Sequence, residues 1–187
     1  MNRKIILASK SPRRNELMKM AGFEFTVASK NVEENHPDGL VPELIPASLA
    51  TKKARAFLNE LDDETIVIGA DTIVILDGII YEKPNDREHA ILMLSALSGK
   101  MHEVVTGVCI LSKSKEVVFS ETTKVYFNSF TLPEIEYYVD NYKPFDKAGS
   151  YACQEWIGAI GIKKFDGDYF NVVGLPINRL YHELKQF

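Results

Sequence analysis

The chain has 187 residues, which is enough for one well-buried core or for one domain with a smaller lobe. Its formal net charge of −4 argues against a general nucleic-acid-binding protein, because such proteins are usually basic. No apolar run approaches the roughly 20 residues that span a bilayer, and the two cysteines, Cys109 and Cys153, form no CxxC pair. We therefore expect a cytoplasmic protein that binds neither nucleic acid nor membrane, with both thiols buried as small apolar residues.

The first segment predicts a strand, a turn and a helix. An apolar strand is expected at residues 4–8, and Ser11 and Pro12 suit the N-cap and the first position of the helix that follows. The apolar stripe of this helix is expected at Leu17, Met20 and Ala21, with Gly22 at its end. Arg13 and Arg14 lie in the first turn, where positive charge is mildly unfavourable unless an anion is bound. Backbone N–H groups and guanidinium forks gathered at one turn favour a phosphate site.

The rest of the first half alternates strand and helix. We expect a half-buried strand at 23–27, a loop at 35–42 with the turn His36-Pro37-Asp38-Gly39, a helix at 46–61, and an extended segment at 65–76 whose first part, 65–70, is buried on both faces.

The second half contains hairpins as well as helices. Asp77-Gly78 predicts a tight turn into a strand at 79–81. A helix capped by Asn85 and Glu88 is expected next, ending near Ser98-Gly99, and two strands follow at 104–111 and 117–127. Thr131 and Glu134 are expected to cap another helix. The last part of the chain is expected to contain a hairpin turn at Asp166-Gly167, an interruption of regular structure at 174–176 and a terminal helix. Because hairpin-joined strands alternate with helices, the sequence predicts an α/β fold with a mixed sheet.

Three acidic residues are candidates for chemistry. Asp71 follows the buried run that ends at residue 70, and ligands of open α/β sheets gather at the carboxyl ends of strands. A carboxylate there can take a proton from water or hold a divalent metal, although a strand-end aspartate can also simply form a turn. Glu33 and Glu34 follow the strand at 23–27, and since neighbouring residues of an extended chain point opposite ways, only one of them is expected to reach a common site.

Two lysines and a glutamine complete the set. Lys53 lies at the border of the apolar stripe of the helix at 46–61, where a lysine often only extends its ammonium to water. Lys83 is held stiffly by the proline after it. Gln154 follows the polar segment 146–151, and its amide offers the donor and acceptor that match the imide edge of uracil or thymine.

These residues together predict phosphoryl or nucleotidyl chemistry, which needs cations for phosphates and acids for a metal. The chain has no Walker A loop and no GxGxxG motif, so a P-loop enzyme or a Rossmann cofactor enzyme is not expected.

Six motifs resemble the signature of the Maf family of nucleoside triphosphate pyrophosphatases. They lie at 7–17 (LASKSPRRNEL), 69–75 (GADTIVI), 82–84 (EKP), 97–99 (LSG), 146–149 (DKAG) and 173–176 (VGLP), in order along essentially the whole chain. The resemblance implies a fold akin to the inosine triphosphate pyrophosphatases, with an elongated mixed sheet flanked by helices and two lobes around a cleft, formed by residues 1–187 as a single domain. It also makes a homodimer a candidate assembly.

The resemblance implies hydrolysis of the α–β phosphoanhydride of a nucleoside triphosphate with a divalent cation, Mg²⁺ or Mn²⁺. By motif, Asp71 is the proton acceptor and shares the metal with Glu34, which the spacing favours over Glu33. Phosphates are bound by Ser9, Arg13, Arg14, Lys53 and Lys83. The positions linked to nucleobase specificity in the family are Arg13, Thr72 and Gln154. Their residue types resemble those of the branch that acts on dTTP and UTP. Position 10 departs from the family pattern, with Lys10 where a small residue is usual.

Two other functions remain open. The enzyme could prefer modified nucleotides such as 5-methyl-UTP, pseudo-UTP or 7-methyl-GTP, and pyrophosphate release across a nucleotide panel separates these substrates. Alternatively, the protein could act as a nucleotide-sensing binding partner of the septum and division machinery. An Asp71→Asn variant that loses hydrolysis but keeps a division phenotype would favour that role.

Overall fold

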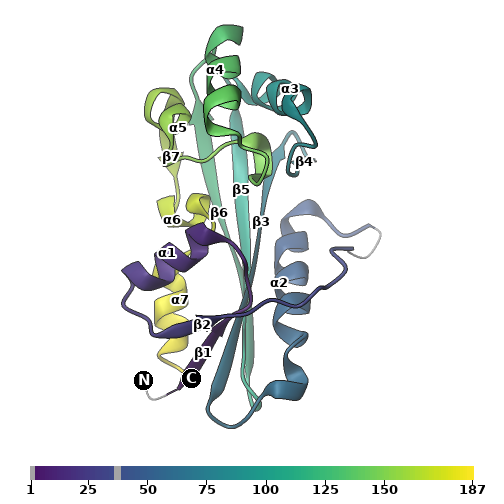
Figure 1. Cartoon of the computed structure of the whole chain (residues 1–187), viewed down its shortest axis with the longest axis vertical. Helices are drawn as coiled ribbons and strands as arrows, with labels where there is room; N and C mark the ends of the chain where they lie inside the picture. The colour runs from purple at the N-terminus through teal and green to yellow at the C-terminus, as the bar shows by residue number, and fades with distance from the viewer. Residues whose placement is uncertain (1–2, 36–38) are drawn as a thin grey trace. The chain divides into compact units, whose positions relative to one another are not determined.

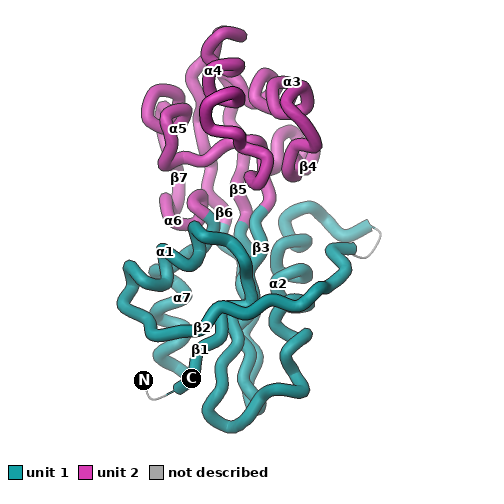
Figure 2. Tube along the Cα trace, in the orientation of Figure 1, with its two compact units in different colours: residues 1–72, 106–121, 174–187 teal, residues 73–105, 122–173 magenta. Residues whose placement is uncertain are grey.

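The computed structural model describes residues 3–35 and 39–187. The chain divides into two compact units, shown in different colours in Figure 2. Unit 1 comprises residues 1–72, 106–121 and 174–187, and unit 2 comprises residues 73–105 and 122–173. Of the predicted turn His36-Pro37-Asp38-Gly39, the first three residues lie outside the described part of the chain, and Gly39 has a positive φ of 78°.

In the described part of the chain, seven strands form one sheet in the order β2-β1-β3-β5-β6-β7, with β4 paired to β3 (Figure 1). The strands are β1 (Lys4–Leu7), β2 (Phe25–Val27), β3 (Thr65–Leu76), β4 (Ile79–Tyr81), β5 (Met101–Leu111), β6 (Glu116–Phe127) and β7 (Ile162–Asp166). Strand β1 is parallel to both β2 and β3, whereas β4 is antiparallel to β3 and β7 is antiparallel to β6. The predicted mixed sheet of an α/β fold is therefore confirmed.

The helices divide between the units. Unit 1 contains α1 (Pro12–Met20), α2 (Ile45–Arg55) and α7 (Ile177–Leu184), with the 3₁₀ turns η1 (Pro42–Leu44) and η2 (Leu58–Glu60). Unit 2 contains α3 (Arg87–Leu97), α4 (Leu132–Tyr142), α5 (Trp156–Gly161) and α6 (Tyr169–Val173), with the 3₁₀ turn η3 (Ala148–Ser150). Within the described residues, none of these helices combines the length and the apolar character that crossing a membrane requires.

Two glycines let α2 lie directly against the sheet in unit 1. A Cβ atom on Gly69 of β3 would come within 2.1 Å of the carbonyl oxygen of Ala50, and one on Gly107 of β5 within 2.1 Å of the backbone nitrogen of Ala47. The core formed there includes Ala50, Ala54 and, as predicted, the buried thiol of Cys109. This close approach fixes the position of α2, which carries Lys53, relative to β3, which carries Asp71.

Unit 2 has its own core, in which α3 and α4 pack with the aromatic side chains of Phe127, Tyr138 and Tyr151. His102 is buried among them, and its Nε2 atom lies 2.7 Å from the hydroxyl of Tyr151. Burial lowers the pKa of His102 from 6.5 to about 3, so this imidazole is neutral. The predicted burial of Cys153 is also confirmed.

In unit 2, one predicted helix cap is confirmed and another is wrong. Thr131 and Glu134 form a capping box, in which the backbone N–H of Thr131 donates to Glu134 Oε2 at 2.7 Å. The cap of α3, by contrast, is Asp86 and not Asn85, because the Asp86 carboxylate accepts the backbone N–H of His89 at 2.8 Å.

Two predictions about helices in unit 1 are wrong in detail. The helix expected at 46–61 ends at Arg55, because the carbonyl of Ala56 accepts a hydrogen bond from Lys30 Nζ at 2.9 Å and the chain continues as η2. Leu58, beyond that point, is 51% exposed and offers no packing that would extend the helix. In α1 the buried residues are Leu17 and Met18, and Met20 is 69% exposed.

The turn predicted at Asp166-Gly167 does not form a hairpin. Strand β7 ends at Asp166, Gly167 has a φ of 131°, and the chain then enters α6. The side chain of Asp168 accepts the backbone N–H of Phe170 at 2.8 Å, which favours the start of a helix over a return strand.

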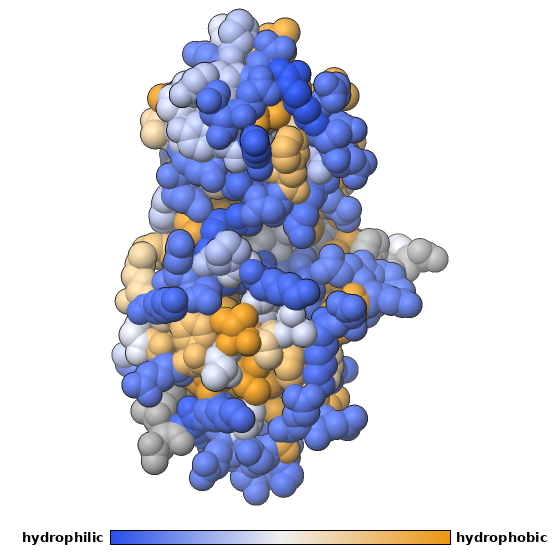
Figure 3. Space-filling model, in the orientation of Figure 1, coloured by the Kyte–Doolittle hydropathy of each residue, from blue (hydrophilic) through white to orange (hydrophobic). Residues whose placement is uncertain are grey.

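Apolar side chains on the surface are mostly scattered. Figure 3 shows a face that is largely hydrophilic, with a group of hydrophobic side chains over unit 1 near β2. Strand β2 is only three residues long and lies at one end of the sheet order, and its Val27 is 47% exposed, so the expected alternation of buried residues stops before Val27. A short edge strand limits unwanted pairing with other chains.

Candidate functional site

The strand, turn and helix predicted at the start of the chain are present in unit 1, as β1, residues 8–11 and α1. Ser11 is the N-cap of α1, where its hydroxyl accepts the backbone N–H of Arg14 at 3.5 Å, and Pro12 is in the first turn. The buried hydroxyl of Ser9 accepts the backbone N–H of Ser11 at 3.2 Å. Both hydroxyls thus shape the turn that presents Arg13 and Arg14.

The side chain of Arg14 is partly buried and donates four hydrogen bonds within unit 1. Its Nε donates to the carbonyl of Gly174 at 2.8 Å, and its Nη1 donates to Ser9 Oγ at 3.1 Å and to the carbonyl of Ala70 at 2.9 Å. Its Nη2 donates to Thr72 Oγ1 at 2.9 Å. Arg14 therefore contacts the residues on both sides of Asp71.

Several charges lie around Arg14. Burial lowers the pKa of Arg14 from its ordinary value, and the positive charge of Arg13 lowers it further, whereas the carboxylates of Asp71 and Glu34 raise it. Two arginines and two carboxylates are consequently close enough in unit 1 to influence one another electrostatically.

Lys53 joins the two carboxylates. Its Nζ atom lies 2.6 Å from Asp71 Oδ1 and 2.7 Å from Glu34 Oε1. The side chains of Lys53 and Asp71 are 17% and 14% exposed, and that of Glu34 is 59% exposed. Two acidic residues that are far apart in the sequence thus converge on a single positive charge.

Only one of the two neighbouring glutamates reaches Lys53, as expected from an extended chain. Glu34 pairs with Lys53, whereas Glu33 Oε2 accepts a hydrogen bond from Asn35 Nδ2 at 2.9 Å. Lys52 also contacts this segment, because its Nζ atom donates to the backbone and side-chain oxygens of Asn35. Both lysines of α2 therefore help to hold the Glu34–Asn35 segment.

Thr106 was not among the residues predicted from the sequence. It is fully buried in β5, and its Oγ1 atom lies 2.9 Å from that of Thr72. The sequence signal is slight: a single hydroxyl inside the apolar run of residues 104–111. Such a residue usually needs a buried hydrogen-bond partner, which here is a predicted site residue.

The pair of carboxylates suits a divalent cation. Asp71 and Glu34 already place one oxygen each within 2.7 Å of a positively charged nitrogen. Two carboxylates, with substrate phosphates and water as the other ligands, form a donor set that Mg²⁺ prefers. Across residues 3–35 and 39–187 no cluster of three or more histidine, cysteine, aspartate or glutamate side chains is arranged to hold a metal.

Lys83 and Gln154 belong to unit 2, and both are exposed. Lys83 follows β4, and the carbonyl of its neighbour Glu82 accepts the backbone N–H of Gly149 at 3.1 Å. Gln154 Oε1 accepts a weak hydrogen bond from the thiol of Cys153 at 3.6 Å. The segment at 146–151 therefore supports the turn that carries Lys83 and leads directly to Gln154.

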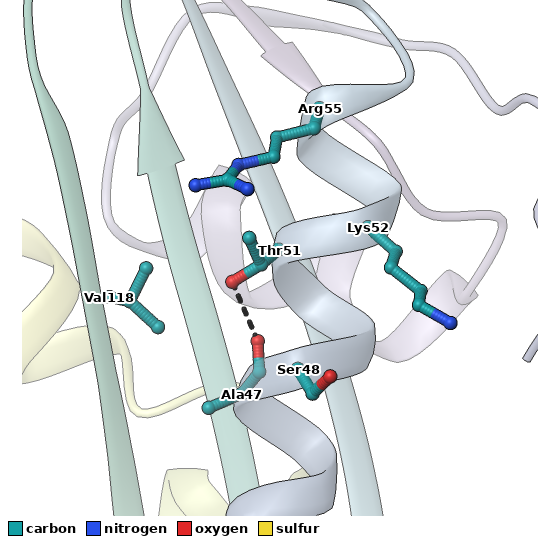
Figure 4. Close-up of a pocket in the computed structure, with 6 residues that line it drawn as sticks. All are labelled: Ala47, Ser48, Thr51, Lys52, Arg55 and Val118. Carbon is teal, nitrogen blue, oxygen red and sulfur yellow. Dashed lines mark hydrogen bonds between the residues drawn. The ribbon is translucent and has the colours of Figure 1, made fainter. Parts of the chain in front are cut away.

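A pocket of about 400 Å³ in unit 1 contains none of the predicted site residues. It is lined by Ala47, Ser48, Thr51, Lys52 and Arg55 of α2 and by Val118 of β6 (Figure 4). The Thr51 hydroxyl is occupied in a 2.8 Å hydrogen bond to the carbonyl of Ala47. Arg55 is occupied as well, in a paired contact with Glu116.

The chain is similar to known proteins over nearly its whole length. A family model described as Maf-like protein matches residues 4–187. A Phocaeicola vulgatus protein named dTTP/UTP pyrophosphatase is 49% identical over 184 residues, which cover 98% of this chain and 95% of the relative. A Porphyromonas gingivalis protein of the same name is 48% identical over 187 residues, covering 98% and 94%. The solved Ham1 protein of Staphylococcus aureus shares the fold at 17% identity, with a TM-score of 0.55 and coverage of 98% and 99%.

Proposed function

The chain belongs to the Maf-like protein family, and on that premise we propose that it hydrolyses dTTP and UTP to the nucleoside monophosphate and pyrophosphate. The name shared by relatives that are 48–49% identical over nearly the full chain supports the choice of substrate. The role we propose is to clean the cytoplasmic nucleotide pool. The homodimer suggested by the motif resemblance stays a prediction, which sedimentation of the purified protein would check.

The observation that carries the proposal is the convergence of Asp71 and Glu34 on Lys53, with distances of 2.6 and 2.7 Å. Arg13 and Arg14 supply further positive charge nearby, because both Arg13 and the two carboxylates affect the pKa of Arg14. Acids next to fixed cations are what hydrolysis of a metal-bound polyphosphate requires.

In the mechanism that we propose, Asp71 accepts a proton from water as the water oxygen attacks the α-phosphorus. The bond from the α-phosphorus to the bridging oxygen breaks, and pyrophosphate leaves with the electron pair. The low exposure of Asp71, at 14%, and its contact with Lys53 keep this carboxylate in one position. A fixed position matters because in-line attack depends on alignment.

Cationic and hydroxyl groups bind the triphosphate in this proposal. Ser9 and Arg13 act from the turn before and within α1, Lys53 from α2, and Lys83 from the turn after β4. Their positive charges offset the negative charge that grows on the leaving pyrophosphate, which lowers the barrier more than ground-state binding would.

Asp71 and Glu34 would hold a divalent cation, Mg²⁺ or Mn²⁺, which when bound supplies charge neutralisation of the phosphates. Lys53 already holds these carboxylates close together against their mutual repulsion. Lys53 therefore keeps the two acids in place for a cation.

Base choice is proposed to depend on Arg13, Thr72 and Gln154. The amide of Gln154 can donate one hydrogen bond and accept another, which matches the carbonyl and N–H of a pyrimidine imide. A guanine presents a different order of donors and acceptors on its Watson–Crick edge. This difference would favour dTTP and UTP over guanine nucleotides.

Pyrophosphate release across a nucleotide panel tests the proposal. The panel contains dTTP, UTP, 5-methyl-UTP, pseudo-UTP, GTP and 7-methyl-GTP, each assayed with Mg²⁺, with Mn²⁺ and with a chelator. We expect dTTP and UTP to be hydrolysed fastest, activity to be lost with chelator, and Asp71→Asn to be inactive. Guanine nucleotides reacting clearly faster than dTTP and UTP would refute the substrate assignment.

A matched pair of variants tests the role of Glu34. Glu34→Gln removes one of the carboxylates at Lys53, whereas Glu33→Gln changes a neighbour that contacts Asn35. We expect Glu34→Gln to need a higher metal concentration for half-maximal activity and Glu33→Gln to resemble the wild type. Equal metal dependence in the two variants would argue against Glu34 as a metal ligand.

A further inference from the structure

We infer that Arg14 and Thr106 are positioning residues, which hydrogen-bond to Thr72 and so fix the backbone next to Asp71. In this inference Arg14 does not bind the triphosphate. This inference rests on the proposed function and deepens it. The resemblance to the family assigns Arg14 to phosphate binding, but its hydrogen bonds in unit 1 point to a different task.

The donors of Arg14 are nearly all in use. A guanidinium has five N–H groups, and Arg14 directs four of them to Gly174 O, Ser9 Oγ, Ala70 O and Thr72 Oγ1. These four acceptors lie 2.8–3.1 Å away, and two of them are backbone carbonyls. A phosphate would have to break some of these bonds to gain the two parallel bonds that arginine usually offers it.

Two of the four bonds bracket Asp71. Nη1 holds the carbonyl of Ala70 and Nη2 holds the hydroxyl of Thr72, the residues immediately before and after it. One rigid planar group therefore fixes the backbone on one side of Asp71 and the side chain on the other. This arrangement keeps the carboxylate of Asp71 oriented toward Lys53, 2.6 Å away.

The hydroxyl of Thr72 is also fully engaged. It accepts the bond from Arg14 Nη2, lies 2.9 Å from Thr106 Oγ1, and lies 3.4 Å from the carbonyl of Gly174, to which it can donate. A hydroxyl has one proton and two lone pairs. Any effect of Thr72 on base choice then comes from where it holds the strand and not from a hydrogen bond to the base.

Thr106 provides a clean test, because it is fully buried and so does not touch a ligand. Its hydroxyl lies 2.9 Å from that of Thr72, which accepts a hydrogen bond from Arg14, so it acts on the Asp71 segment through Thr72. Thr106→Val removes the hydroxyl at nearly constant volume, and Thr106→Ser keeps it. Thr51→Val is the matched control, since the Thr51 hydroxyl donates to the carbonyl of Ala47 within α2, away from Thr72 and Arg14.

The experiment is steady-state kinetics with dTTP and UTP, after urea unfolding has shown that each variant is folded. We expect Thr106→Val to lower kcat about tenfold, the usual effect of misplacing one hydrogen-bonded group, with KM within about twofold of the wild type. Thr106→Ser should restore kcat, and Thr51→Val should not change it. Normal kcat in Thr106→Val would overturn the inference.

Arg14→Lys tests the phosphate alternative directly, because lysine keeps the charge but loses the planar fork. A positioning role predicts a lower kcat with KM and pyrophosphate product inhibition nearly unchanged. A KM and an inhibition constant that both rise while kcat is unchanged would mean that Arg14 binds phosphate, which overturns the inference. If Arg14→Lys does not fold, the Thr106 variants decide.

The kinetics also separate this inference from the proposed function. No pyrophosphate from dTTP or UTP with the wild-type protein would overturn the proposed function, and the inference with it. An active wild type combined with normal kcat in Thr106→Val would overturn the inference alone.

Discussion

The buried His102 predicts that unit 2 loses stability in mild acid. Burial lowers the pKa of its imidazole from 6.5 to about 3. In the unfolded chain the imidazole takes up a proton as the pH falls below 6.5, but in the folded chain it does not until about pH 3. The stability that the neutral His102 contributes is thus fully present above pH 6.5 and is lost as the pH falls from 6.5 toward 3.

The magnitude follows from the size of the pKa difference. Each pH unit between the two pKa values costs up to about 1.4 kcal/mol, so a fall from pH 6.5 to pH 5 costs up to about 2 kcal/mol. Urea unfolding at several pH values measures this loss. Trp156 is the single tryptophan of the chain and lies in unit 2, so its fluorescence reports on the unit that contains His102.

A variant separates His102 from the other groups that titrate in this range. His102→Gln can keep a hydrogen bond to Tyr151 but cannot titrate, so its stability should fall less steeply between pH 6.5 and pH 5. His182→Gln changes an exposed histidine of α7 and should follow the wild type. Parallel curves for His102→Gln and the wild type would refute the reasoning.

Three other substitutions have clear expected outcomes. Gly69→Ala should lower the free energy of unfolding in urea by about 2 kcal/mol or more, since its Cβ would lie 2.1 Å from Ala50 O; an unchanged midpoint would contradict the close packing of α2. Lys53→Met should lower kcat/KM for dTTP about a hundredfold, and the control Lys52→Met far less. Asp86→Ala should cost about 1 kcal/mol in thermal or urea unfolding, and equal cost from Asn85→Ala would contradict the cap assignment.

Local rules predicted the parts of the site that depend on neighbouring residues. Ser11 and Pro12 set the start of α1 because an N-cap hydroxyl and a proline at the first position act within one turn. The continuous apolar run before Asp71 predicted β3, since a strand buried on both faces needs no polar alternation. The capping box of Thr131 and Glu134 was predicted correctly for the same reason, because its hydrogen bonds join residues only three positions apart.

Contacts between distant residues set the limit of the sequence prediction. The pairing of Lys53 with both Asp71 and Glu34, and the bonds of Arg14 to Gly174 and Ala70, join segments up to 160 residues apart. No local pattern encodes them. Asn85 and Asp86 are neighbours of similar capping chemistry, and only the structure shows that the Asp86 carboxylate accepts the backbone N–H of His89.

The position of oxygen from water in the products tests the central claim most directly. The wild-type protein would hydrolyse dTTP in water enriched in oxygen-18, and mass spectrometry would locate the label. Attack of water at the α-phosphorus predicts label in dTMP, unlabelled pyrophosphate, and no reaction with Asp71→Asn. Label in pyrophosphate or in orthophosphate would contradict the account, because water would then have attacked a different phosphorus.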